Sequence, residues 1–332
     1  MIIQSIFEKC NKYTAVREGE VKFGQVIAVN NTNLSHLDEL QSLIKTYSAP
    51  YVLLGIPEDI GVRANMGKAG ARHAFDAFLS YFVNIQQNEY TSPSDIYLLG
   101  EIYVDDLVGV SDTTDDIHTL RQLTAEVDER VFGVIQTIVR CGKIPIVIGG
   151  GHNNAYGIIK GVSLALNQKI NVINIDPHAD FRIEEGRHSG NGFRYAYVQG
   201  FLSRYGVYGW HENYNNHVII EAIKNHEDLM VVSYDDIWRR RACSFSEFLQ
   251  SFEASVGLEI DLDSIRNMPT SAVTPVGFSE EEILRMIFEI GNRKEVHYYH
   301  LTEGAPDEKN RFQIGKFLSY AVSEILKTKM LK

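Results

Sequence analysis

Short apolar runs recur along this chain, separated by stretches in which apolar residues return every three or four positions. The runs are rich in Val, Ile and Tyr, and most are continuously apolar instead of alternating with polar residues. This pattern is typical of strands that are buried on both faces of a parallel sheet. The predicted strands are Tyr51–Gly55, Ile96–Gly100, Ile144–Ile148, Asn171–Ile175, Tyr205–Trp210, Leu229–Ser233, Gly257–Asp261 and Val296–Leu301.

Helical patterns lie between and after these runs. The clearest covers Ser279–Gly291, where Ser279 and Glu282 form a capping box and Gly291-Asn292 predicts the end of the helix. Its apolar stripe consists of Ile283, Leu284, Ile287 and Phe288. A second stripe, near the C-terminus, consists of Phe317, Leu318, Ala321, Val322, Ile325 and Leu326.

Strands that alternate with helices predict an α/β fold with a doubly wound, mainly parallel sheet. At roughly 100–200 residues per domain, a chain of 332 residues is long enough for one large domain or two ordinary ones. About eight strands suit one domain better. We therefore expect a single domain over residues 1–332, with 1–45 as a less clearly assigned N-terminal segment.

The charge balance argues against nucleic acid as a partner, because the chain has 32 Lys and Arg against 43 Asp and Glu, a net charge of −11. The N-terminus has no apolar stretch typical of a signal peptide, and no run approaches the ~20 apolar residues that cross a bilayer. Cys10, Cys141 and Cys243 are far apart and lack a Cys-x-x-Cys spacing, as expected of reduced thiols. We expect a cytoplasmic protein that acts on a small molecule, with no membrane partner.

Chemistry-bearing residues follow four predicted strands, at the carboxyl ends where open parallel sheets bind ligands. They lie in Gly149-Gly150-Gly151-His152, Asp176-Pro177-His178-Ala179-Asp180, Asp261-Leu262-Asp263 and Thr302-Glu303-Gly304. Each segment alone has an ordinary explanation as a turn residue, a helix cap, a strand end or a surface acid. If all four segments lie at one end of the sheet, the ordinary explanations together require four coincidences.

The spacing of the acidic residues indicates a metal centre. Asp176, His178 and Asp180 occupy alternate positions, so an extended backbone points them to one side, and Asp261 and Asp263 repeat this geometry. Converging carboxylates repel one another unless cations lie among them. Four aspartates and two histidines suit Mn²⁺ better than a thiolate-bound Zn²⁺, and four aspartate charges balance two divalent ions. Two such ions lower the pKa of a water molecule and polarise an electrophile.

The motifs around His152, Asp176–Asp180 and Ile260–Asp263 resemble the three signatures of the ureohydrolase superfamily, which comprises arginases, agmatinases and formimidoylglutamases. The resemblance covers roughly positions 50 to 326. It includes a first strand and loop in Leu54–Asp59, Gly61-Val62 and Gly70-Ala71-Arg72. It implies a three-layer α/β/α fold with an eight-stranded, mainly parallel sheet and two Mn²⁺ per chain.

The resemblance also implies the metal ligands. One ion would be bound by His152, Asp176, Asp180 and Asp261. The other would be bound by His178, Asp176, Asp261 and Asp263, with Asp176 and Asp261 bridging. Glu259 stands where the family usually has Ser, which leaves the pair Glu259/Asp261 as an alternative register; Asp261/Asp263 keeps the Asp-x-Asp motif intact.

Departures from the arginase pattern bear on the subfamily. Gly151 precedes His152 where arginases and agmatinases usually have Asp, and Gly is typical of formimidoylglutamases. Phe193 replaces the catalytic His of the arginase Ser-Gly-Asn-x-His stretch, as in formimidoylglutamases, and His188 lies five residues earlier. Pro177 replaces the family's Ala, which should stiffen the loop without removing a ligand.

The resemblance assigns two ends to the substrate. Arg182 replaces the Asn that touches the α-carboxylate in arginases, and a guanidinium suits a substrate with two carboxylates. Ser189 and Asn191 would assist Arg182, although a solvated loop arginine is an equal alternative for that residue. Glu303 matches the Glu that holds the amidinium or guanidinium, and Asp180 would relay a proton to the leaving amine.

The resulting hypothesis is a dimanganese hydrolase of a linear amidine, with N-formimidoyl-L-glutamate, an intermediate of histidine degradation, cleaved to L-glutamate and formamide. A guanidine hydrolase such as arginase or agmatinase is the first alternative. A catalytically silent member of the fold is a second alternative, against which the retention of every metal ligand speaks. A one-zinc deacetylase of related fold is a third. A homo-oligomer is a possible state.

Overall fold

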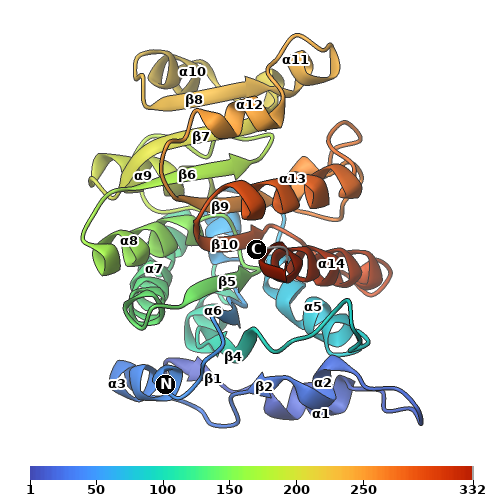
Figure 1. The fold of residues 1–332 in the computed structure, drawn as a ribbon. Coiled ribbons are helices and arrows are strands. Elements are labelled where there is room, and N and C mark those ends of the chain that lie inside the picture. Colours follow the sequence, from blue (N-terminus) through green and yellow to red (C-terminus); the bar gives the residue numbers. More distant parts are fainter. Residues whose placement is uncertain (331–332) are drawn as a thin grey trace.

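The computed structural model describes residues 1–330, and within them ten strands form one sheet (Figure 1). The order across the sheet is β1-β4-β3-β5-β10-β9-β6-β7-β8, and β2 also pairs with β4. The strands are β1 (Ile3–Gln4), β2 (Ala28–Val29), β3 (Tyr51–Gly55), β4 (Ile96–Ile102), β5 (Ile144–Ile148), β6 (Ile170–Ile175), β7 (Leu202–Trp210), β8 (Leu229–Ser233), β9 (Val256–Asp261) and β10 (Val296–Thr302).

Every predicted strand is present, as β3 to β10, and the predicted α/β class with a mainly parallel sheet is confirmed. The expected number of eight strands was too low by two, because β1 and β2 also join the sheet. Each has only two residues, too short to produce an apolar run. β1 is antiparallel to β4, whereas the other recorded strand pairs are parallel.

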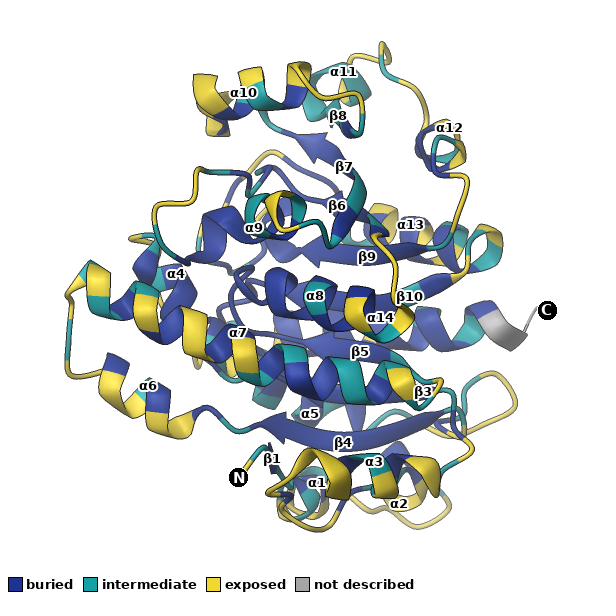
Figure 2. Ribbon diagram, turned by 90° about the vertical axis from the view of Figure 1, so that its left-hand side faces the viewer, coloured by how far each residue is buried: buried dark blue, intermediate teal, exposed yellow. Residues whose placement is uncertain are grey.

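Helices cover both faces of the sheet and complete the three layers (Figure 1). One face carries α3 (Leu37–Lys45), α7 (Ile117–Arg140), α8 (Asn154–Leu166), α9 (Gly192–Val198) and α10 (His217–Lys224). The other carries α1 (Phe7–Tyr13), α5 (Ala74–Phe82), α12 (Phe245–Gln250), α13 (Glu280–Arg293) and α14 (Arg311–Met330). The remaining α-helices of the described residues are α2 (Phe23–Val26), α4 (Ile60–Ala64), α6 (Asp105–Ser111) and α11 (Tyr234–Trp238). In Figure 2, α7 shows exposed residues on its outer side and buried ones toward the sheet.

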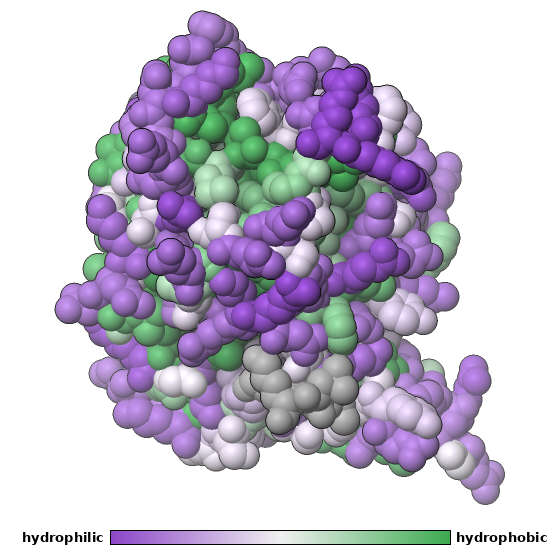
Figure 3. Space-filling model, turned by 45° about the horizontal axis from the view of Figure 1, so that its top comes forward, coloured by the Kyte–Doolittle hydropathy of each residue, from purple (hydrophilic) through white to green (hydrophobic). Residues whose placement is uncertain are grey.

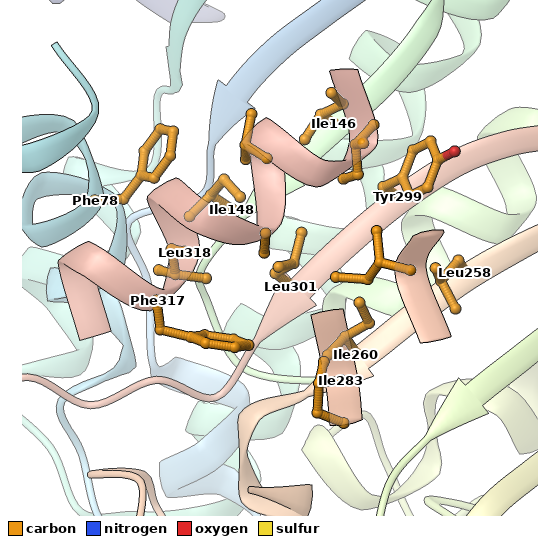
Figure 4. Packing of buried hydrophobic residues seen from close by; sticks show 14 of the residues in the cluster. Phe78, Ile146, Ile148, Leu258, Ile260, Ile283, Tyr299, Leu301, Phe317 and Leu318 are labelled. Atoms are coloured by element: carbon orange, nitrogen blue, oxygen red, sulfur yellow. The ribbon is translucent and has the colours of Figure 1, made fainter. Parts of the chain in front are cut away.

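The sheet divides the hydrophobic core into two clusters, one on each face. Alternate residues of a strand enter different clusters, as Leu53 and Leu54 of β3 do, because side chains of a strand point to opposite faces. Figure 4 shows part of the cluster on the α13 and α14 side, with labelled side chains that include Ile148 from β5, Ile260 from β9, Leu301 from β10, Ile283 from α13 and Leu318 from α14.

The predicted helix near residue 280 begins as expected but ends later. Ser279 caps α13 and forms the capping box with Glu282. The helix continues past Gly291 to Arg293. Gly291 lies where α13 packs closely against α14, and it does not end the helix. A Cβ at Gly291 would lie 2.6 Å from side-chain atoms of Thr328 in α14, so only glycine permits this approach. Phe288, predicted in the apolar stripe, is 39% exposed, and the buried residues of the helix are Ile283, Met286, Ile287, Ile290 and Gly291.

The C-terminal stripe is confirmed, since all six of its residues are buried in α14. Among the described residues, no helix combines the length and apolar character that a membrane crossing requires. Hydrophilic residues cover most of the face shown in Figure 3, and hydrophobic ones gather in a smaller area toward its upper part.

Candidate metal centre

The predicted functional residues lie together at the carboxyl ends of four neighbouring strands. In the sheet these strands follow one another as β5-β10-β9-β6 (Figure 1). His152 follows β5, Asp176 to Asp180 follow β6, Asp261 ends β9 and Glu303 follows β10. Segments that are up to 151 residues apart in the chain thus contribute to one site.

A first group of ligand atoms surrounds the imidazole of His152. Its Nδ1 lies 2.9 Å from Asp180 Oδ2, 3.1 Å from Asp261 Oδ2 and 3.2 Å from Asp176 Oδ2. One ligand atom from each of these four residues lies within 4.8 Å of the others. This spacing suits a group that surrounds one metal ion.

A second group contains His178, Asp261 and Asp263, whose ligand atoms also lie within 4.8 Å of one another. His178 Nδ1 is 3.7 Å from Asp263 Oδ2 and 3.4 Å from Asp176 Oδ1. Asp261 belongs to both groups, and Asp176 directs one oxygen toward each histidine. The six residues predicted as metal ligands are thus adjacent, in two groups that share carboxylates.

The same local turn shapes both aspartate motifs. Asp176 Oδ1 accepts a hydrogen bond from the backbone N–H of His178 at 2.6 Å, and Asp261 Oδ1 accepts one from that of Asp263 at 2.7 Å. A side chain that bonds its own backbone two residues on is the turn that Asp forms readily. Asp180 has a φ of 45°, an uncommon value for a residue other than glycine.

The acidic cluster is electrostatically unbalanced. Burial, followed by repulsion from Asp263 and Asp176, raises the pKa of Asp261 well above its usual range. Burial also raises the pKa values of Asp180 and Asp263. For Asp176, burial acts in the same direction, but the two histidines outweigh it and lower the pKa. Buried carboxylates in such a cluster are stabilised by cations, and hard oxygen ligands suit Mn²⁺ or a similar divalent ion.

A buried glutamate that the sequence did not single out as functional holds the loop before His152. Glu58 Oε1 accepts hydrogen bonds from the backbone N–H of Gly151 at 3.1 Å and from the side-chain amide of Asn154 at 2.5 Å. Its Oε2 accepts one from the backbone N–H of Ile60 at 2.7 Å. The only sequence signal was its place in the Leu54–Asp59 segment.

Glu303 is buried beside the acidic cluster and is held at both oxygens. Its Oε1 accepts a hydrogen bond from the backbone N–H of His152, and its Oε2 accepts one from the Ser271 hydroxyl, each at 2.7 Å. Burial and the nearby charge of Asp263 raise the pKa of Glu303 to about 8. Its φ of 65° is also unusual. Ser271 was missed because it belongs to none of the sequence motifs.

Two adjoining cavities open beside the cluster. The inner cavity, of about 130 Å³, is lined by residues that include Ser189, Asp261, Asp263, Ser271 and Glu303. The outer cavity, of about 200 Å³, is lined by residues that include Arg182, Gly190, Tyr214 and Asn215. Asn65, His178 and Asp180 line both. The combined space therefore extends from Glu303, past the metal-ligand cluster, to Arg182.

Arg182 lies at the outer end of this space with its side chain 41% exposed. Its Nε and Nη2 donate to Glu185 Oε1 at 3.2 and 3.1 Å. Ser189 lines the inner cavity, and its hydroxyl accepts a hydrogen bond from the side-chain amide of Asn65 at 3.3 Å. Of the predicted substrate contacts, Arg182, Ser189 and Glu303 thus line the cavities.

Asn191 is placed differently from Arg182 and Ser189. It is fully buried, and its Oδ1 accepts hydrogen bonds from the Arg187 guanidinium at 2.5 Å and from the backbone N–H of His188 at 3.1 Å. Its Nδ2 donates to the backbone carbonyl of Gly186 at 2.8 Å. The side-chain amide therefore holds the 186–191 loop together, and the residue does not line either cavity.

Two other residues of this region are buried. The ring of Phe193 meets the His152 ring edge to face, with centroids 5.1 Å apart, and stacks on Tyr205 at 4.4 Å. His188 Nδ1 accepts a hydrogen bond from the backbone N–H of Gly190 at 3.1 Å. Burial and repulsion from neighbouring arginines lower the pKa of His188 to about 4.

The geometry also bears on the register of the third motif. Asp261 and Asp263 both belong to the His178 group, whereas Glu259 belongs to a separate group with His152 and His300, on the other side of the His152 ring, and contacts Tyr298. Burial would raise the pKa of Glu259, but His300 and His152 lower it to about 2. The arrangement therefore fits the Asp261/Asp263 pair better than Glu259/Asp261.

Comparison with known proteins relates this chain to one family and to solved structures. The model of the arginase family matches residues 49–324. Similar curated proteins are the formimidoylglutamase of Streptococcus gordonii, 26% identical over 253 residues (73% of this chain and 70% of the relative), and that of Macrococcus caseolyticus, 24% identical over 278 residues (81% and 83%). One similar solved structure is the formimidoylglutamase of Bacillus subtilis, with a TM-score of 0.74 and 18% identity, covering 98% of this chain and 99% of that one. Another is the Trypanosoma cruzi formiminoglutamase with Mn²⁺, with a TM-score of 0.71 and 20% identity, covering 92% of this chain and 98% of that one.

The chain belongs to the arginase family, because the family model matches well over half of it. It is thus a metal-dependent hydrolase of amidino groups, as the resemblance implied. Within the family it is similar to the formimidoylglutamases, and this expectation is also confirmed. The two solved structures share its three-layer fold.

Proposed function

We propose that this protein is a dimanganese hydrolase that cleaves N-formimidoyl-L-glutamate to L-glutamate and formamide. The observation that carries the proposal is the combined cavity, which has an acid at one end, a guanidinium at the other and the metal-ligand cluster between them. The substrate has the complementary order: an amidinium, the C–N bond to be broken and two carboxylates. The formimidoylglutamase relatives support the same substrate.

Six side chains would hold two Mn²⁺ ions in this site. His152, Asp176, Asp180 and Asp261 would bind one ion, and His178, Asp176, Asp261 and Asp263 the other. The fit rests on the oxygen-rich ligand set, on two groups that share Asp261 and on four carboxylates whose charge balances two dications. When bound, the ions supply a water molecule of lowered pKa and polarise the amidine carbon. The T. cruzi structure with Mn²⁺ supports this choice of metal.

The proposed role of Glu303 is to hold the amidinium. Its two oxygens are fixed by the His152 backbone and by Ser271, so the carboxylate is oriented before the substrate binds. A cationic amidinium beside Glu303 favours the ionised form of the carboxyl group and so opposes the effect of burial and of Asp263 on its pKa. A preorganised charge in a buried site interacts more strongly with a cationic group than a mobile one in water. Asp180 lines both cavities, and we assign it the transfer of a proton to the leaving amine of glutamate.

The carboxylate end is assigned to Arg182 and Ser189. The planar guanidinium of Arg182 matches a carboxylate with two parallel hydrogen bonds. Asn191 would contribute indirectly, because its side chain holds the loop that presents Ser189. The overall reaction of the amidinium consumes one water: its oxygen enters formamide, and both of its protons end on the glutamate nitrogen, which leaves as an ammonium group as the C–N bond breaks.

A guanidine hydrolase is the other candidate. Phe193 occupies the position of the arginase catalytic His, and its ring packs on His152 and Tyr205. A phenyl ring cannot transfer a proton there, so we expect arginine to be a poor substrate. The free thiols of Cys10, Cys141 and Cys243 suit a reducing compartment, and we propose a cytoplasmic location.

One assay panel tests the substrate. The manganese-loaded protein is given N-formimidoyl-L-glutamate, arginine, agmatine and guanidinobutyrate, and formamide and urea are measured. We expect formamide from the first compound at a kcat/KM at least a hundredfold above that for urea release from the others. Efficient urea release from arginine or agmatine would refute the proposed substrate.

A further inference from the structure

A second buried polar cluster lies directly behind His152 and consists of Glu259, Tyr298 and His300. Glu259 on β9 is the register partner of His300 on β10, so the two side chains lie side by side on one face of the sheet. Glu259 Oε1 accepts a hydrogen bond from the Tyr298 hydroxyl at 2.7 Å. Its Oε2 lies 2.5 Å from His300 Nδ1. All three residues are fully buried.

The two nitrogens of His152 face different partners. Nδ1 points to the three carboxylates of the first ligand group, whereas Nε2 lies 3.5 Å from Glu259 Oε2. Within the described part of the chain, Nε2 has no hydrogen-bond partner of good geometry. A neutral imidazole that binds a metal through Nδ1 carries its proton on Nε2, and a buried N–H requires an acceptor. Glu259 is the acceptor that faces this atom.

We propose that Glu259 is a positioning residue for His152. It accepts the Nε2–H of His152 and so fixes the ring orientation and the tautomer in which Nδ1 is free to bind a metal. Carboxylates that orient a metal-binding histidine in this way are a general device of metal sites. The inference rests on the proposed metal centre and adds a residue to it that binds neither metal nor substrate.

The chemistry of position 259 explains why Glu occurs where Ser is usual in the family. An ionised carboxylate accepts about four hydrogen bonds and donates none. Three donors can converge on it here: the Tyr298 hydroxyl, His300 and His152. A serine hydroxyl has too few acceptor sites for three donors. Glu259, Tyr298 and His300 therefore form one set, in which two residues hold the carboxylate and the carboxylate holds His152.

Neighbouring rings restrict the other movements of His152. Phe193 lies edge to face against it, and the His300 ring centroid is 6.0 Å away. These contacts limit translation of the imidazole but provide no acceptor for Nε2. When Nδ1 binds a metal, Glu259 is therefore the acceptor left for the proton on Nε2.

The test compares manganese binding by the full chain and its Glu259→Gln variant, using titration calorimetry and electron paramagnetic resonance of Mn²⁺. Gln has nearly the same size, but its amide offers fewer acceptor sites and adds donors. We expect one of the two ions to bind about 10- to 100-fold more weakly, in line with losses of outer partners of metal ligands, and the other to change less. Glu101→Gln is the matched control, because Glu101 is a buried strand carboxylate paired with Lys9 at 2.8 Å, and its variant should bind both ions normally.

Two further measurements keep the outcome decisive. In a His152→Ala background, Glu259→Gln should cause little additional loss of manganese affinity, because Glu259 acts on the metal through His152. If Glu259→Gln does not fold, Tyr298→Phe removes one hydrogen bond to the same carboxylate. We then expect a two- to fivefold loss of affinity for the same ion. Unchanged affinities for both ions in the folded variants would overturn the inference. A wild-type protein that does not bind two ions would instead refute the proposed metal centre.

Discussion

Replacement of Arg182 by Asn tests whether the outer end of the cavity recognises a carboxylate. The guanidinium of Arg182 lines the outer cavity, whereas Glu303 lines the inner one, and the predicted metal ligands lie between them. The substitution therefore removes a binding group and leaves the reacting centre intact. We expect KM for N-formimidoyl-L-glutamate to rise while kcat stays within about twofold, the behaviour of a lost contact that is equal in ground and transition states.

The size of the effect follows from the surroundings of Arg182. A hydrogen bond to a charged group contributes ~1.5–3 kcal/mol, and ~1.4 kcal/mol corresponds to a tenfold change. The side chain is 41% exposed and already paired with Glu185, so solvent screening and competition reduce its contribution. We therefore expect a contribution near the lower limit of this range of free energies, which corresponds to an increase in KM of about tenfold.

Steady-state kinetics with two substrates and one matched variant make the experiment decisive. A neutral formamidine without carboxylates should be cleaved equally by wild type and the Arg182→Asn variant. Glu185→Gln should act in the opposite direction and lower KM for the acidic substrate, because it frees the guanidinium from its partner. Equal losses for acidic and neutral substrates would show that Arg182 is structural, and the reasoning about the carboxylate end would be wrong.

Three other predictions concern single positions. Glu303→Gln removes the charge that faces the amidinium, so kcat/KM should fall roughly 10- to 100-fold with every amidine, and a loss confined to one substrate would argue against this role. The pKa of His188 is about 4 in the folded protein, below the usual ~6.5, so the unfolded chain binds the proton first. The free energy of unfolding should therefore fall as pH drops from about 6.5 towards 4, and less steeply in His188→Asn; equal slopes in urea denaturation would contradict this. Gly291→Ala forces a Cβ to within 2.6 Å of Thr328 and should cost about 1–3 kcal/mol, whereas Gly109→Ala, with open space around it, should not destabilise.

Much of the fold could be predicted from the sequence because buried parallel strands leave continuous apolar runs. β3, β5 and β8 have the predicted limits, and the other five long strands differ by one to three residues at an end. β1 and β2 could not be predicted, since two residues at a sheet edge have no periodicity. Gly291 was misjudged for a related reason: a glycine that ends a helix and one that admits a neighbouring helix look the same in sequence.

The proximity of the candidate metal ligands could be predicted because these residues follow strands of a parallel sheet, whose carboxyl ends lie at the same edge. Contacts that depend on side-chain packing could not. Ser271 donates a hydrogen bond to Glu303 from a loop without a motif. Glu58 accepts a hydrogen bond from the backbone of Gly151, in the glycine loop before His152. Asn191 was expected to touch substrate, but its hydrogen bonds are directed into its own loop. Such directions depend on rotamers and neighbours that spacing alone does not determine.

The binding of two metal ions by these carboxylates and histidines is central to the proposed function. Its most direct test is the number of manganese ions bound per chain after reconstitution, in the wild type, in Asp176→Asn, which alters a shared ligand, and in Asp263→Ala, which alters one ligand group. We predict two ions for the wild type, weakened binding of both in Asp176→Asn, and weakened binding of mainly one in Asp263→Ala. A single tightly bound zinc ion per chain, unaffected by Asp263→Ala, would contradict the account.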